Sequence, residues 1–574
     1  MRKSDPIARH SHACYRAPVS PLSFTGRTWV LHETEEVDGD VVDRLLRRRQ
    51  MDPLGKGEIL DTFGYDARHF LDFEKAAERI TRAISSKEKM GIFGDYDCDG
   101  ITSTVLLARF LHRRGIQPMM RLPNRLHEGY GLQQAIVEEF RSAGVTLLLT
   151  VDTGATAIEP IARARDVGID VIVLDHHHLS PMLPPACAIL HPSLTSSPMD
   201  PAPCGAGVTW SVVDGLEGHA EWEDRATDIA LAAIGTVADV VELRGGNRTL
   251  THSGLLALSR LKNGPLALLC MHAGLQMPYA SRDIAFRLAP RINAAGRMAD
   301  PHIALSALLG DTEALRALDA LNRERQDAVS AHLEDLLPRA EAALRQAQGG
   351  SILCFIHDDY SPGICGLLAG RLCEAFGKPV LVGARRDGIC TASLRSIPAF
   401  NVTTGLARAA DLLLTFGGHA MAAGCSFHTE VFDVLRERLE ADVRASVPPA
   451  LLIPRIAADA MLTPDDVTLH LCDALQTMEP FGQGNSEPRF LIQSIRLDSV
   501  HCVGNGKKHL QASVRGRKLI GFGLGHLEEH VGQSLDLLCR VGIDTWQGRR
   551  APQLFLDDMR VAAGIRPEPV SLPS

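Results

Sequence analysis

The 574-residue sequence contains no run of eighteen or more apolar residues, and it does not start with a basic stretch followed by an apolar one. A membrane-spanning helix needs about 20 mainly apolar residues, and a secretory leader needs a short apolar core behind basic residues. We therefore expect no membrane insertion and no secretion, and we expect the protein in the bacterial cytoplasm.

Cysteine pairs typical of zinc ribbons or redox motifs are also lacking, because none of the thirteen cysteines belongs to a C-x-x-C pair. Most lie inside apolar or glycine-rich runs, as Cys270, Cys354 and Cys365 do. Such positions are typical of reduced core thiols in a cytosolic protein. The length and the 45% hydrophobic content predict several ordinary globular domains.

Acidic residues are absent from Ser499 to Leu527, although the whole chain has a net charge of −9. This stretch holds a basic patch that consists of Lys507, Lys508, Arg515, Arg517 and Lys518. Alternating polarity and glycine turns predict the strands of an OB-like barrel, on which the basic patch would follow a nucleic-acid backbone. A solvated basic hairpin is the alternative, and Phe522 is the only aromatic residue there that could stack on a base.

Four aspartate-bearing segments follow apolar runs in the first half of the chain. They are GDYDCDG at 94–100, TVDTG at 150–154, VLDHHH at 173–178 and GTVADVV at 235–241. The first follows a buried strand at 90–93 and precedes a helix over 102–111, which makes one α/β unit. The runs 145–151 and 171–174 predict two more strands that also end in aspartate.

In an open parallel sheet, ligands bind beyond the carboxyl ends of the strands. Three strands that each end in aspartate should therefore aim these side chains into one crevice, where Asp239, at the end of the apolar stretch 229–237, would join them. Several carboxylates and a histidine pair are ligands for divalent cations, and two such cations hydrolyse phosphate esters.

Each segment also has a simpler interpretation. Aspartate after a strand often caps a helix or starts a turn, which would explain Asp152 or Asp239 taken alone. GDYDCDG could be an EF-hand-like loop, but the required glutamate six residues after its glycine is replaced by Leu106. Three consecutive histidines could be a solvated run, although their position after a buried strand favours a ligand role.

In order and spacing, the four segments resemble the motifs of the DHH phosphoesterase superfamily. PRINAAGR at 290–297, SLRS at 393–396 and FGGHAMAAG at 416–424 resemble further motifs of its RecJ branch, the single-strand-specific 5′ to 3′ exonucleases. EPFGQGNSEPRF at 479–490 is similar to the start of that branch's OB-like module. The resemblance spans about residues 40–560. Shorter relatives that cleave oligoribonucleotides or cyclic dinucleotides lack this extra length.

The resemblance implies a two-ion site for Mg²⁺ or Mn²⁺, ions that suit carboxylate and imidazole ligands. The implied metal ligands are Asp95, Asp97, Asp99, Asp152, Asp175, His176 and Asp239. The implied catalytic residues are Asp97, Asp99, Asp152, His176, His177 and Asp239. Asp152 would bridge the two ions, and His177 would act behind the ligands or on the phosphate.

Two positions depart from the family pattern. Phe93 stands where many superfamily members have a histidine, and the exonuclease branch often has an apolar residue there. Ser361 stands where the family commonly has a histidine before its GxxGxxA helix. The role that the family pattern gives to a histidine at this position therefore does not carry over to this chain.

Residues outside the metal cluster are expected to hold the substrate. The candidates are Arg125, Arg291, Asn293, Arg297, Ser393, Arg395, Ser396, Gly417, Gly418 and His419. The Gly417–His419 segment is expected beside a helix N-terminus, which is an anion site, and Arg395 could fork onto a terminal phosphate. Each arginine alone could equally form a surface ion pair.

The resulting fold class is α/β with a C-terminal barrel. We expect an irregular and helical segment at 1–85, a parallel-sheet DHH catalytic domain at 86–305 and a connector helix within 306–350. A smaller α/β DHH-associated domain at 351–447, an OB-like barrel at 448–563 and a disordered tail at 564–574 complete the chain.

The function implied by the resemblance is stepwise hydrolysis of single-stranded DNA from its 5′ end, in recombination and repair. An oligoribonuclease or cyclic-dinucleotide phosphodiesterase, or an inactive DNA-binding relative, are the alternatives. The implied partners are single-stranded DNA, a helicase and a single-strand-binding protein, and we expect a monomer.

Overall fold

The computed structural model describes residues 22–32, 40–54, 65–124, 128–129, 131–218, 222–345, 350–545 and 548–562. The chain forms two compact units. The barrel unit contains the described residues up to Leu45 together with 449–475 and the residues from 488 onward, and the two-lobed unit contains 46–448 and 476–487. Helix α1 (Val41–Arg49) spans the boundary between them.

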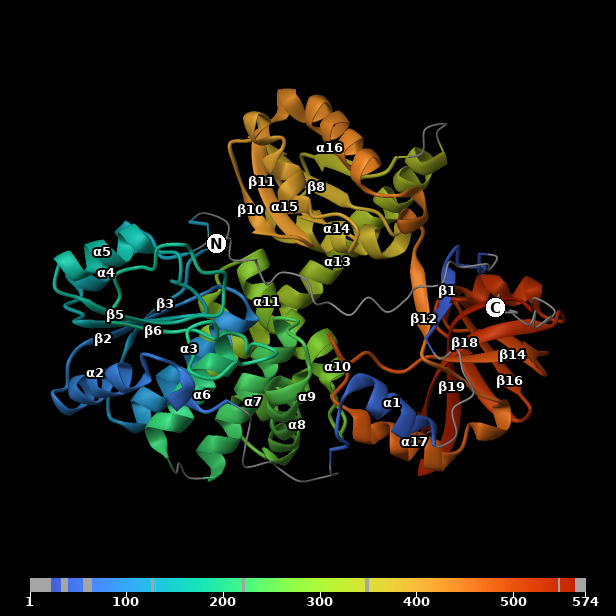
Figure 1. Ribbon diagram of the computed structural model, residues 1–574, viewed down its shortest axis with the longest axis horizontal. Coiled ribbons are helices and arrows are strands. Elements are labelled where there is room, and N and C mark those ends of the chain that lie inside the picture. Colours follow the sequence, from blue (N-terminus) through green and yellow to red (C-terminus); the bar gives the residue numbers. More distant parts are fainter. Residues whose placement is uncertain are drawn as a thin grey trace, which may run out of the picture. The chain divides into compact units, whose positions relative to one another are not determined.

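The first lobe of the two-lobed unit is built on a parallel sheet in the order β3-β2-β4-β5-β6. Its strands are β2 (Met90–Gly94), β3 (Met119–Arg121), β4 (Leu147–Val151), β5 (Asp170–Leu174) and β6 (Ala188–Leu190). The helices around it are α2 (Phe73–Ser85), α3 (Cys98–Arg113), α4 (Gln134–Ser142), α5 (Ile158–Asp166) and α6 (Gly205–Glu217). Figure 1 shows α4 and α5 on one face and α2 on the other, which explains why β2 and β4 are buried along their whole length.

A helical layer follows the sheet and ends in a long connector. Its helices are α7 (Trp222–Ala238), α8 (Gly245–Arg260), α9 (Pro265–His272), α10 (Ser281–Asp283), the π-helical turn η2 (Ile284–Leu288), α11 (Ala289–Met298) and α12 (His302–Leu308). Helix α13 (Thr312–Arg345) has 34 residues and is therefore about 50 Å long. The predicted connector helix is confirmed, with Pro338 inside it.

The second lobe carries a mixed sheet in the order β10-β11-β9-β8-β7. Its strands are β7 (Leu353–His357), β8 (Val380–Arg386), β9 (Ile389–Arg395), β10 (Thr415–His419) and β11 (Ala422–His428), and its helices are α14 (Pro362–Phe376), α15 (Val402–Ala407) and α16 (Phe432–Ser446). Only the β7–β8 pair is parallel within this sheet. The expected second α/β domain is thus present.

The barrel unit has the strand order of an OB fold. Its elements are β12 (Arg455–Ala458), β13 (Ala460–Met461), α17 (Leu469–Leu475), β14 (Phe490–Ile495), β15 (Val500–Val503), β16 (His509–Val514), β17 (Arg517–Gly521), β18 (Leu535–Asp544) and β19 (Ala551–Val561). The path β15-β16-β17-β19-β18-β14 places the two halves of one bent strand, β14 and β15, at its ends. The OB-like barrel is therefore confirmed.

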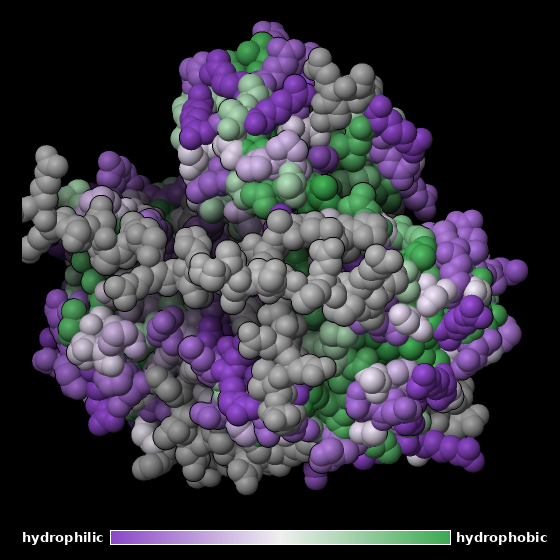
Figure 2. Space-filling model, turned by 45° about the vertical axis from the view of Figure 1, so that its right-hand side comes forward, coloured by the Kyte–Doolittle hydropathy of each residue, from purple (hydrophilic) through white to green (hydrophobic). Residues whose placement is uncertain are grey.

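Short helical turns complete the described elements. They are η1 (Ala67–His69), η3 (Ala410–Leu412), η4 (Thr429–Val431), η5 (Pro449–Leu452), η6 (Pro464–Asp466), η7 (Gln476–Met478), η8 (Asn505–Lys507) and η9 (Gly525–His530). None of the helices within the described ranges is both long enough and apolar enough to cross a bilayer. The face drawn in Figure 2 is largely hydrophilic, with hydrophobic side chains showing between the hydrophilic ones.

The N-terminal segment differs from the prediction of an irregular start. Strand β1 (Thr28–Leu31) pairs in parallel with β12 of the barrel unit. Trp29 is buried, its indole N–H donates to Asp558 at 2.9 Å, and the Arg560 guanidinium lies 4.5 Å from its ring centre. The four residues of β1 have no strong periodicity and so gave no strand signal in the sequence. The strand that orders them lies more than 400 residues further along the chain.

Candidate active site

The GDYDCDG segment forms a tight loop between β2 and α3. Asp97 is the N-cap of α3, and its Oδ1 accepts hydrogen bonds from the backbone N–H groups of Asp99 (3.0 Å) and Gly100 (3.1 Å). A Cβ atom at Gly100 would lie 2.5 Å from the Asp95 backbone oxygen, so only glycine fits there. The loop therefore holds three aspartates within five residues, with Asp95 and Asp99 almost fully buried.

The second and third segments end neighbouring strands, as predicted. Asp152 follows β4 with a left-handed φ of 59°, which is uncommon for a residue other than glycine. Its backbone N–H donates to the Leu174 carbonyl at 2.9 Å, which fixes Asp152 beside the end of β5. The left-handed turn lifts the buried carboxylate of Asp152 over the sheet edge, toward the histidines that follow β5.

Asp175 has contacts that differ from those expected of a metal ligand. Its Oδ1 accepts hydrogen bonds from the N–H groups of His176 (2.7 Å) and His177 (3.1 Å) and lies 2.8 Å from His177 Nδ1. Its Oδ2 accepts from the Ala155 N–H at 2.8 Å. Both oxygens are thus occupied by donors of the chain. Unlike the other expected ligands, Asp175 belongs to none of the groups of neighbouring ligand atoms among the described residues, so we assign it to holding the histidine loop in place and not to metal binding.

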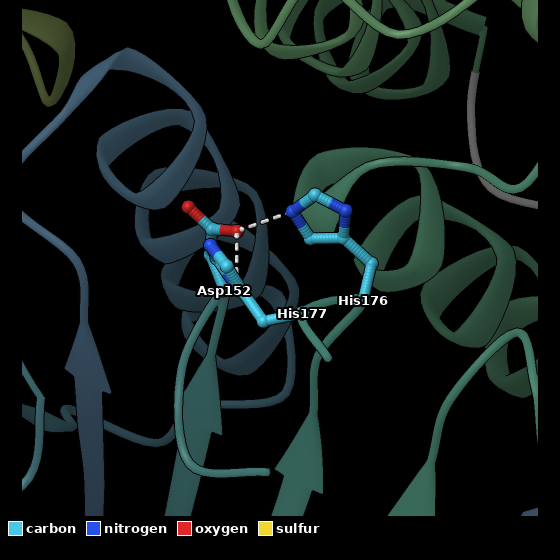
Figure 3. A group of neighbouring side chains, drawn as sticks. All are labelled: Asp152, His176 and His177. Carbon is cyan, nitrogen blue, oxygen red and sulfur yellow. Dashed lines mark ion pairs between the residues drawn. The ribbon is translucent and has the colours of Figure 1, made fainter. Parts of the chain in front are cut away.

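One oxygen of Asp152 is the point on which the two histidines converge (Figure 3). His176 Nε2 lies 3.1 Å from Asp152 Oδ1, and His177 Nδ1 lies 3.8 Å from the same atom. His176 Nε2 is also 3.6 Å from Asp239 Oδ2 and 3.9 Å from Asp99 Oδ2. Asp239 follows the C-terminus of helix α7, so the fourth segment ends a helix and not a strand.

The ligand atoms fall into groups whose members all lie within 4.8 Å of one another. These groups are Asp95 with Asp97 and Asp152, Asp99 with His176 and Asp239, and Asp152 with His176 and His177. The carboxylates and the imidazole are the donor set that Mg²⁺ and Mn²⁺ accept. Asp152 Oδ1 and His176 Nε2 are buried and make no hydrogen bond, as expected of atoms that face a cation. These residues fit a site for divalent cations, in which Asp152 and His176 would each belong to two groups of ligand atoms.

The crowding of carboxylates shifts their pKa values upward. Burial, followed by repulsion from Asp99 and Asp97, raises the pKa of Asp152 well above its usual value and that of Asp239 to about 9. Burial lowers the pKa of His176, which keeps its imidazole neutral and able to bind metal. Burial disfavours the charged form of His177 as well, but the Asp175 hydrogen bond outweighs it and raises the pKa of His177 to about 9.

These shifts predict how metal-free protein responds to pH. A group whose pKa is raised on folding contributes stability below its unfolded-state pKa, and this contribution is lost as the pH rises through the folded-state value. For Asp239 and His177 this loss extends to about pH 9. We therefore expect the melting temperature in a chelator to fall between about pH 6.5 and pH 9, and Mn²⁺ to remove most of the fall. If the melting temperature fell equally with and without Mn²⁺ across this pH range, the proposed cluster of titrating metal ligands would be contradicted.

The N-terminus of helix α6 holds Asp99. The Cys204 thiol donates to Asp99 Oδ1 at 3.1 Å, and the N–H groups of Gly205 and Ala206 donate to its two oxygens at 2.7 and 2.9 Å. Burial, with the Asp99 charge as a second cause, raises the pKa of the Cys204 thiol, so the thiol keeps its proton. The sequence analysis missed this support, because Cys204 stands outside all four aspartate segments.

Two variants of Cys204 test whether its thiol supports Asp99. Cys204→Ala removes the thiol donor, and we expect about tenfold weaker Mn²⁺ binding, the usual effect of losing a hydrogen bond to a metal ligand. Cys204→Ser keeps a donor and should bind Mn²⁺ nearly as the unchanged chain does. Calorimetric titration of both variants provides the measurement, and equal affinity of the alanine and serine variants would rule the role out.

A cavity of about 550 Å³ opens beside the metal ligands. Its lining residues include His176, His177, His191, Asp239 and His419. His191 was not predicted, although it follows strand β6 and so obeys the same strand-end rule as the aspartates. Its Nδ1 accepts from the Ser193 N–H, and its Nε2 donates to the His177 carbonyl at 2.7 Å, which steadies the histidine loop.

Several predicted substrate residues of the first lobe have partners within the fold. Arg291 pairs with Asp319 at 2.8 Å, and the Arg297 guanidinium donates to the Gly363 carbonyl at 3.0 Å. Asn293 Oδ1 accepts from the Cys98 N–H at 2.8 Å, so it braces the aspartate loop. Arg125 lies outside the described residues.

The predicted residues of the second lobe lie on β9 and β10. Arg395 ends β9, and one of its guanidinium nitrogens donates to the Leu394 carbonyl at 2.8 Å, whereas buried Ser396 donates to the Phe400 carbonyl. Ser393 faces α14, since its Oγ would lie 3.6 Å from a Cβ at Gly366. The segment Gly417–His419 is part of exposed strand β10. It lies beside the N-terminus of α15, as expected, because the Thr403 hydroxyl donates to the His419 carbonyl at 2.8 Å and the Val402 N–H donates to the Ala420 carbonyl at 3.0 Å. A continuous ladder with β11 imposes the strand.

The basic patch of the barrel is partly neutralised by distant acids. Lys518 pairs with Asp544 at 2.7 Å, and Arg515 lies 3.6 Å from Asp465. Lys507 and Lys508 are exposed on the loop before β16, which is one of the ligand-binding loops of OB folds. Exposed Phe522 meets the His509 ring edge-to-face at 5.4 Å. The acid-free stretch in the sequence therefore overstates the local charge.

Comparisons with known proteins follow the same division of the chain. The model of the DHH family, N-terminal domain, matches residues 89–236. The DHHA1 domain matches residues 349–445, and the RecJ OB domain matches residues 458–558. These spans coincide with the parallel-sheet lobe, the second lobe and the barrel.

Whole proteins match over most of the chain. The single-stranded-DNA-specific exonuclease RecJ of Bacillus subtilis is 33% identical over 542 residues, which cover 91% of this chain and 68% of that protein. The exonuclease of the same name from Escherichia coli is 32% identical over 527 residues, or 85% of this chain and 90% of that protein.

Solved structures agree with the sequences. The crystal structure of RecJ from Thermus thermophilus in complex with Mn²⁺ has a TM-score of 0.78 at 28% identity and covers 92% of this chain and 77% of that chain. A crystal structure of exonuclease RecJ bound to manganese has a TM-score of 0.57 at 33% identity, with 66% of this chain and 96% of that chain covered. This chain therefore belongs to the RecJ family of single-stranded-DNA-specific exonucleases.

Proposed function

We propose that the protein is a metal-dependent exonuclease that hydrolyses single-stranded DNA from its 5′ end and releases mononucleotides. The observation that carries this proposal is the sharing of Asp152 between two groups of ligand atoms at one sheet edge. Two ions held side by side suit the hydrolysis of a phosphodiester. The relatives crystallised with Mn²⁺ or Mg²⁺ support the choice of ions.

The residues divide the work as follows. Bound Mg²⁺ or Mn²⁺ supplies an activated water and neutralises charge on the reacting phosphate. The ligands that would hold the ions are Asp95, Asp97, Asp99, Asp152, His176 and Asp239. Asp175 keeps the His177 ring at the wall of the cavity, where a protonated ring would donate to a phosphate oxygen. Asp99 is oriented by the start of α6.

The preference for a 5′ end and for a single strand rests on the second lobe. Ser393 and Arg395 lie on the strand that packs on helix α14, and we assign them to the terminal phosphate, which a guanidinium binds well. Lys507, Lys508 and Phe522 are the residues of the barrel that we assign to the strand outside the cleft, through phosphate contacts and base stacking.

The setting follows from chemistry and from the family resemblance. Twelve cysteines of the described residues are free, which supports a reducing compartment and thus the cytoplasm. A helicase and a single-strand-binding protein as partners, a role in recombination and repair, and a monomeric state are carried over from the resemblance.

A substrate panel tests the proposal. The chain is incubated with Mn²⁺ or Mg²⁺ and with single-stranded DNA, blunt duplex DNA, short RNA or a cyclic dinucleotide. We expect single-stranded DNA to release a 5′ label as a mononucleotide within the first turnovers. A 3′ label should be released only late. Faster cleavage of short RNA or of the cyclic dinucleotide would contradict single-stranded DNA as the substrate. Early release of the 3′ label would contradict hydrolysis from the 5′ end.

A further inference from the structure

Residues 476–487 lie within the barrel unit in sequence but belong to the two-lobed unit in the fold. They contain most of the segment EPFGQGNSEPRF, which resembles the start of the OB-like module. We call residues 476–487 the inserted segment. In the fold, the inserted segment contacts residues 239–244, which join helices α7 and α8 and which we call the ligand turn. The ligand turn begins with Asp239, one of the proposed metal ligands.

The course of the backbone sets where the Asp239 carboxylate lies. Asp97 and Asp99 are oriented by hydrogen bonds to their side chains, from two and three donors respectively. The Asp239 carboxylate accepts no hydrogen bond from any of the described residues. Its backbone N–H donates to the Gly235 carbonyl at 2.9 Å, which continues the hydrogen bonds of α7. The ligand turn must therefore keep its shape if Asp239 is to stay beside His176.

The ligand turn has a strained backbone that is held at both ends. Val240 has a left-handed φ of 62°. A β-branched residue adopts this conformation only where the surrounding structure enforces it. Helix α7 holds the upstream end. At the downstream end, the Leu243 N–H donates to the Gln483 carbonyl at 2.7 Å, and the Glu242 carbonyl accepts from the Asn247 side chain at 3.1 Å. One of these two downstream anchors belongs to the inserted segment.

Two glycines let the inserted segment approach the ligand turn closely. A Cβ atom at Gly484 would lie 2.9 Å from the Cβ of Glu242, and one at Gly482 would lie 2.7 Å from Cδ1 of Leu243. Both distances are shorter than real Cβ contacts allow. Leu243 is only 2% exposed, so its side chain has little freedom to move aside. The two backbones are thus as close as residues without a side chain permit.

Buried side chains fix the conformation of the inserted segment. Asn485 is fully buried, and its Nδ2 donates to two carbonyl groups within the segment, at 2.8 and 2.9 Å. Arg248 of helix α8 is only 4% exposed and donates to the carbonyls of Thr477 and Glu479 at 2.9 and 3.2 Å. These bonds tie the segment to the helix that follows the ligand turn. The segment is therefore a fixed part of the catalytic unit.

We propose that the inserted segment positions Asp239 for metal binding, through Gly482, the Gln483 carbonyl and Gly484. This inference rests on the proposed function, because it assigns a positioning role at the same metal site. Groups that orient metal ligands from behind commonly contribute 10- to 100-fold to metal affinity. The inserted segment would do so through the backbone of the ligand turn, since the Asp239 side chain has no hydrogen bond of its own.

The test uses Gly484→Ala in the full chain. The new methyl group would push Glu242 and with it the ligand turn, so we expect about tenfold weaker Mn²⁺ binding in calorimetric titrations without DNA. Gly168→Ala is the matched control. Both glycines are exposed and left-handed, with φ of 70° and 82°, but nothing lies within 4 Å of a Cβ at Gly168. The melting temperature in a chelator should fall in both variants, and only Gly484→Ala should lose Mn²⁺ affinity.

A second variant, Asp239→Asn, identifies the residue through which the segment acts. Mn²⁺ binding should remain measurable in this background, because Asp95, Asp97 and Asp152 are kept. Adding Gly484→Ala should then change the affinity little, since the ligand that it displaces is already lost. An equal loss of affinity in both backgrounds, or an unchanged affinity in Gly484→Ala alone, overturns the proposal.

Kinetics with single-stranded DNA separate metal positioning from DNA binding. At Mn²⁺ concentrations below saturation, Gly484→Ala should lower kcat about tenfold and keep the KM for DNA. A raised KM with an unchanged kcat would assign the inserted segment to the DNA and overturn the proposal. A chain that degrades no single-stranded DNA would refute the proposed function instead. The Mn²⁺ titrations need no DNA and so test the inserted segment separately.

Discussion

Asp152→Asn is expected to reduce DNA hydrolysis by about 10³-fold or more. Asp152 belongs to two groups of ligand atoms, as His176 also does, and a neutral amide cannot bridge two cations as a carboxylate would. Loss of about 4 kcal/mol of transition-state stabilisation, a modest share of what two cations supply, accounts for a factor of this size. Initial rates of mononucleotide release with Mn²⁺ provide the measurement.

The same variant should melt at a higher temperature than the unchanged chain in a chelator. Burial and four neighbouring carboxylates raise the pKa of Asp152, so its ionisation favours the unfolded chain at neutral pH. Asparagine removes this penalty, and Mn²⁺ should then add little further stability. Asp166→Asn, an exposed aspartate at the end of α5, is the control that should change neither property. If Asp152→Asn retained its activity, the proposal that Asp152 bridges two cations would be contradicted.

Gly205→Ala is expected to lower activity about 10²-fold. A Cβ atom at Gly205 would lie 2.6 Å from both the Cβ and the Oδ1 of Asp152, closer than real Cβ contacts allow. The added methyl group would push the Asp152 carboxylate away and also shift the Gly205 N–H, which donates to Asp99 at 2.7 Å. One methyl group thus disturbs two of the proposed metal ligands.

The expected signature of Gly205→Ala is weaker Mn²⁺ binding, by 10 to 100-fold, with a stability cost of about 1–3 kcal/mol. Gly370→Ala is the matched control, because Gly370 is also helical and its nearest neighbour in the vicinity of a new Cβ lies 4.0 Å away. That change should be neutral or stabilising, since alanine favours helix. Wild-type Mn²⁺ affinity in Gly205→Ala would show that the carboxylate has room to move.

The predictable part of the fold and site follows from local patterns. The strands before Asp95, Asp152 and Asp175 are short apolar runs, and the parallel order places their ends at one edge, as the strand-end rule requires. The topology of the sheet therefore gathers most of the acid and histidine residues, and the end of helix α7 brings Asp239 to them. His191 obeys the same rule and could have been found by it.

The remaining features depend on partners that are distant in sequence. Asp175 resembles a ligand in the sequence, but in the fold it lies outside the groups of ligand atoms and accepts hydrogen bonds from the Ala155 N–H and the His177 ring. The Gly417–His419 segment was expected beside a helix N-terminus, but its own strand conformation follows only from its pairing with β11. The barrel's basic patch loses much of its charge to Asp544 and Asp465, which lie outside the acid-free stretch.

The pairing of β1 with β12 sets an order of events during synthesis. Thr28 leaves the ribosome more than 400 residues before its partner Arg455, and at 5–20 residues per second this gap lasts roughly 20 to 90 s. The sheet of the first lobe can form meanwhile, while Trp29 waits for the acceptor that Asp558 brings near the end of translation. If translation stops early, the Trp29 indole stays exposed. Chaperones and proteases would then bind this apolar side chain before any loss of catalysis could be detected.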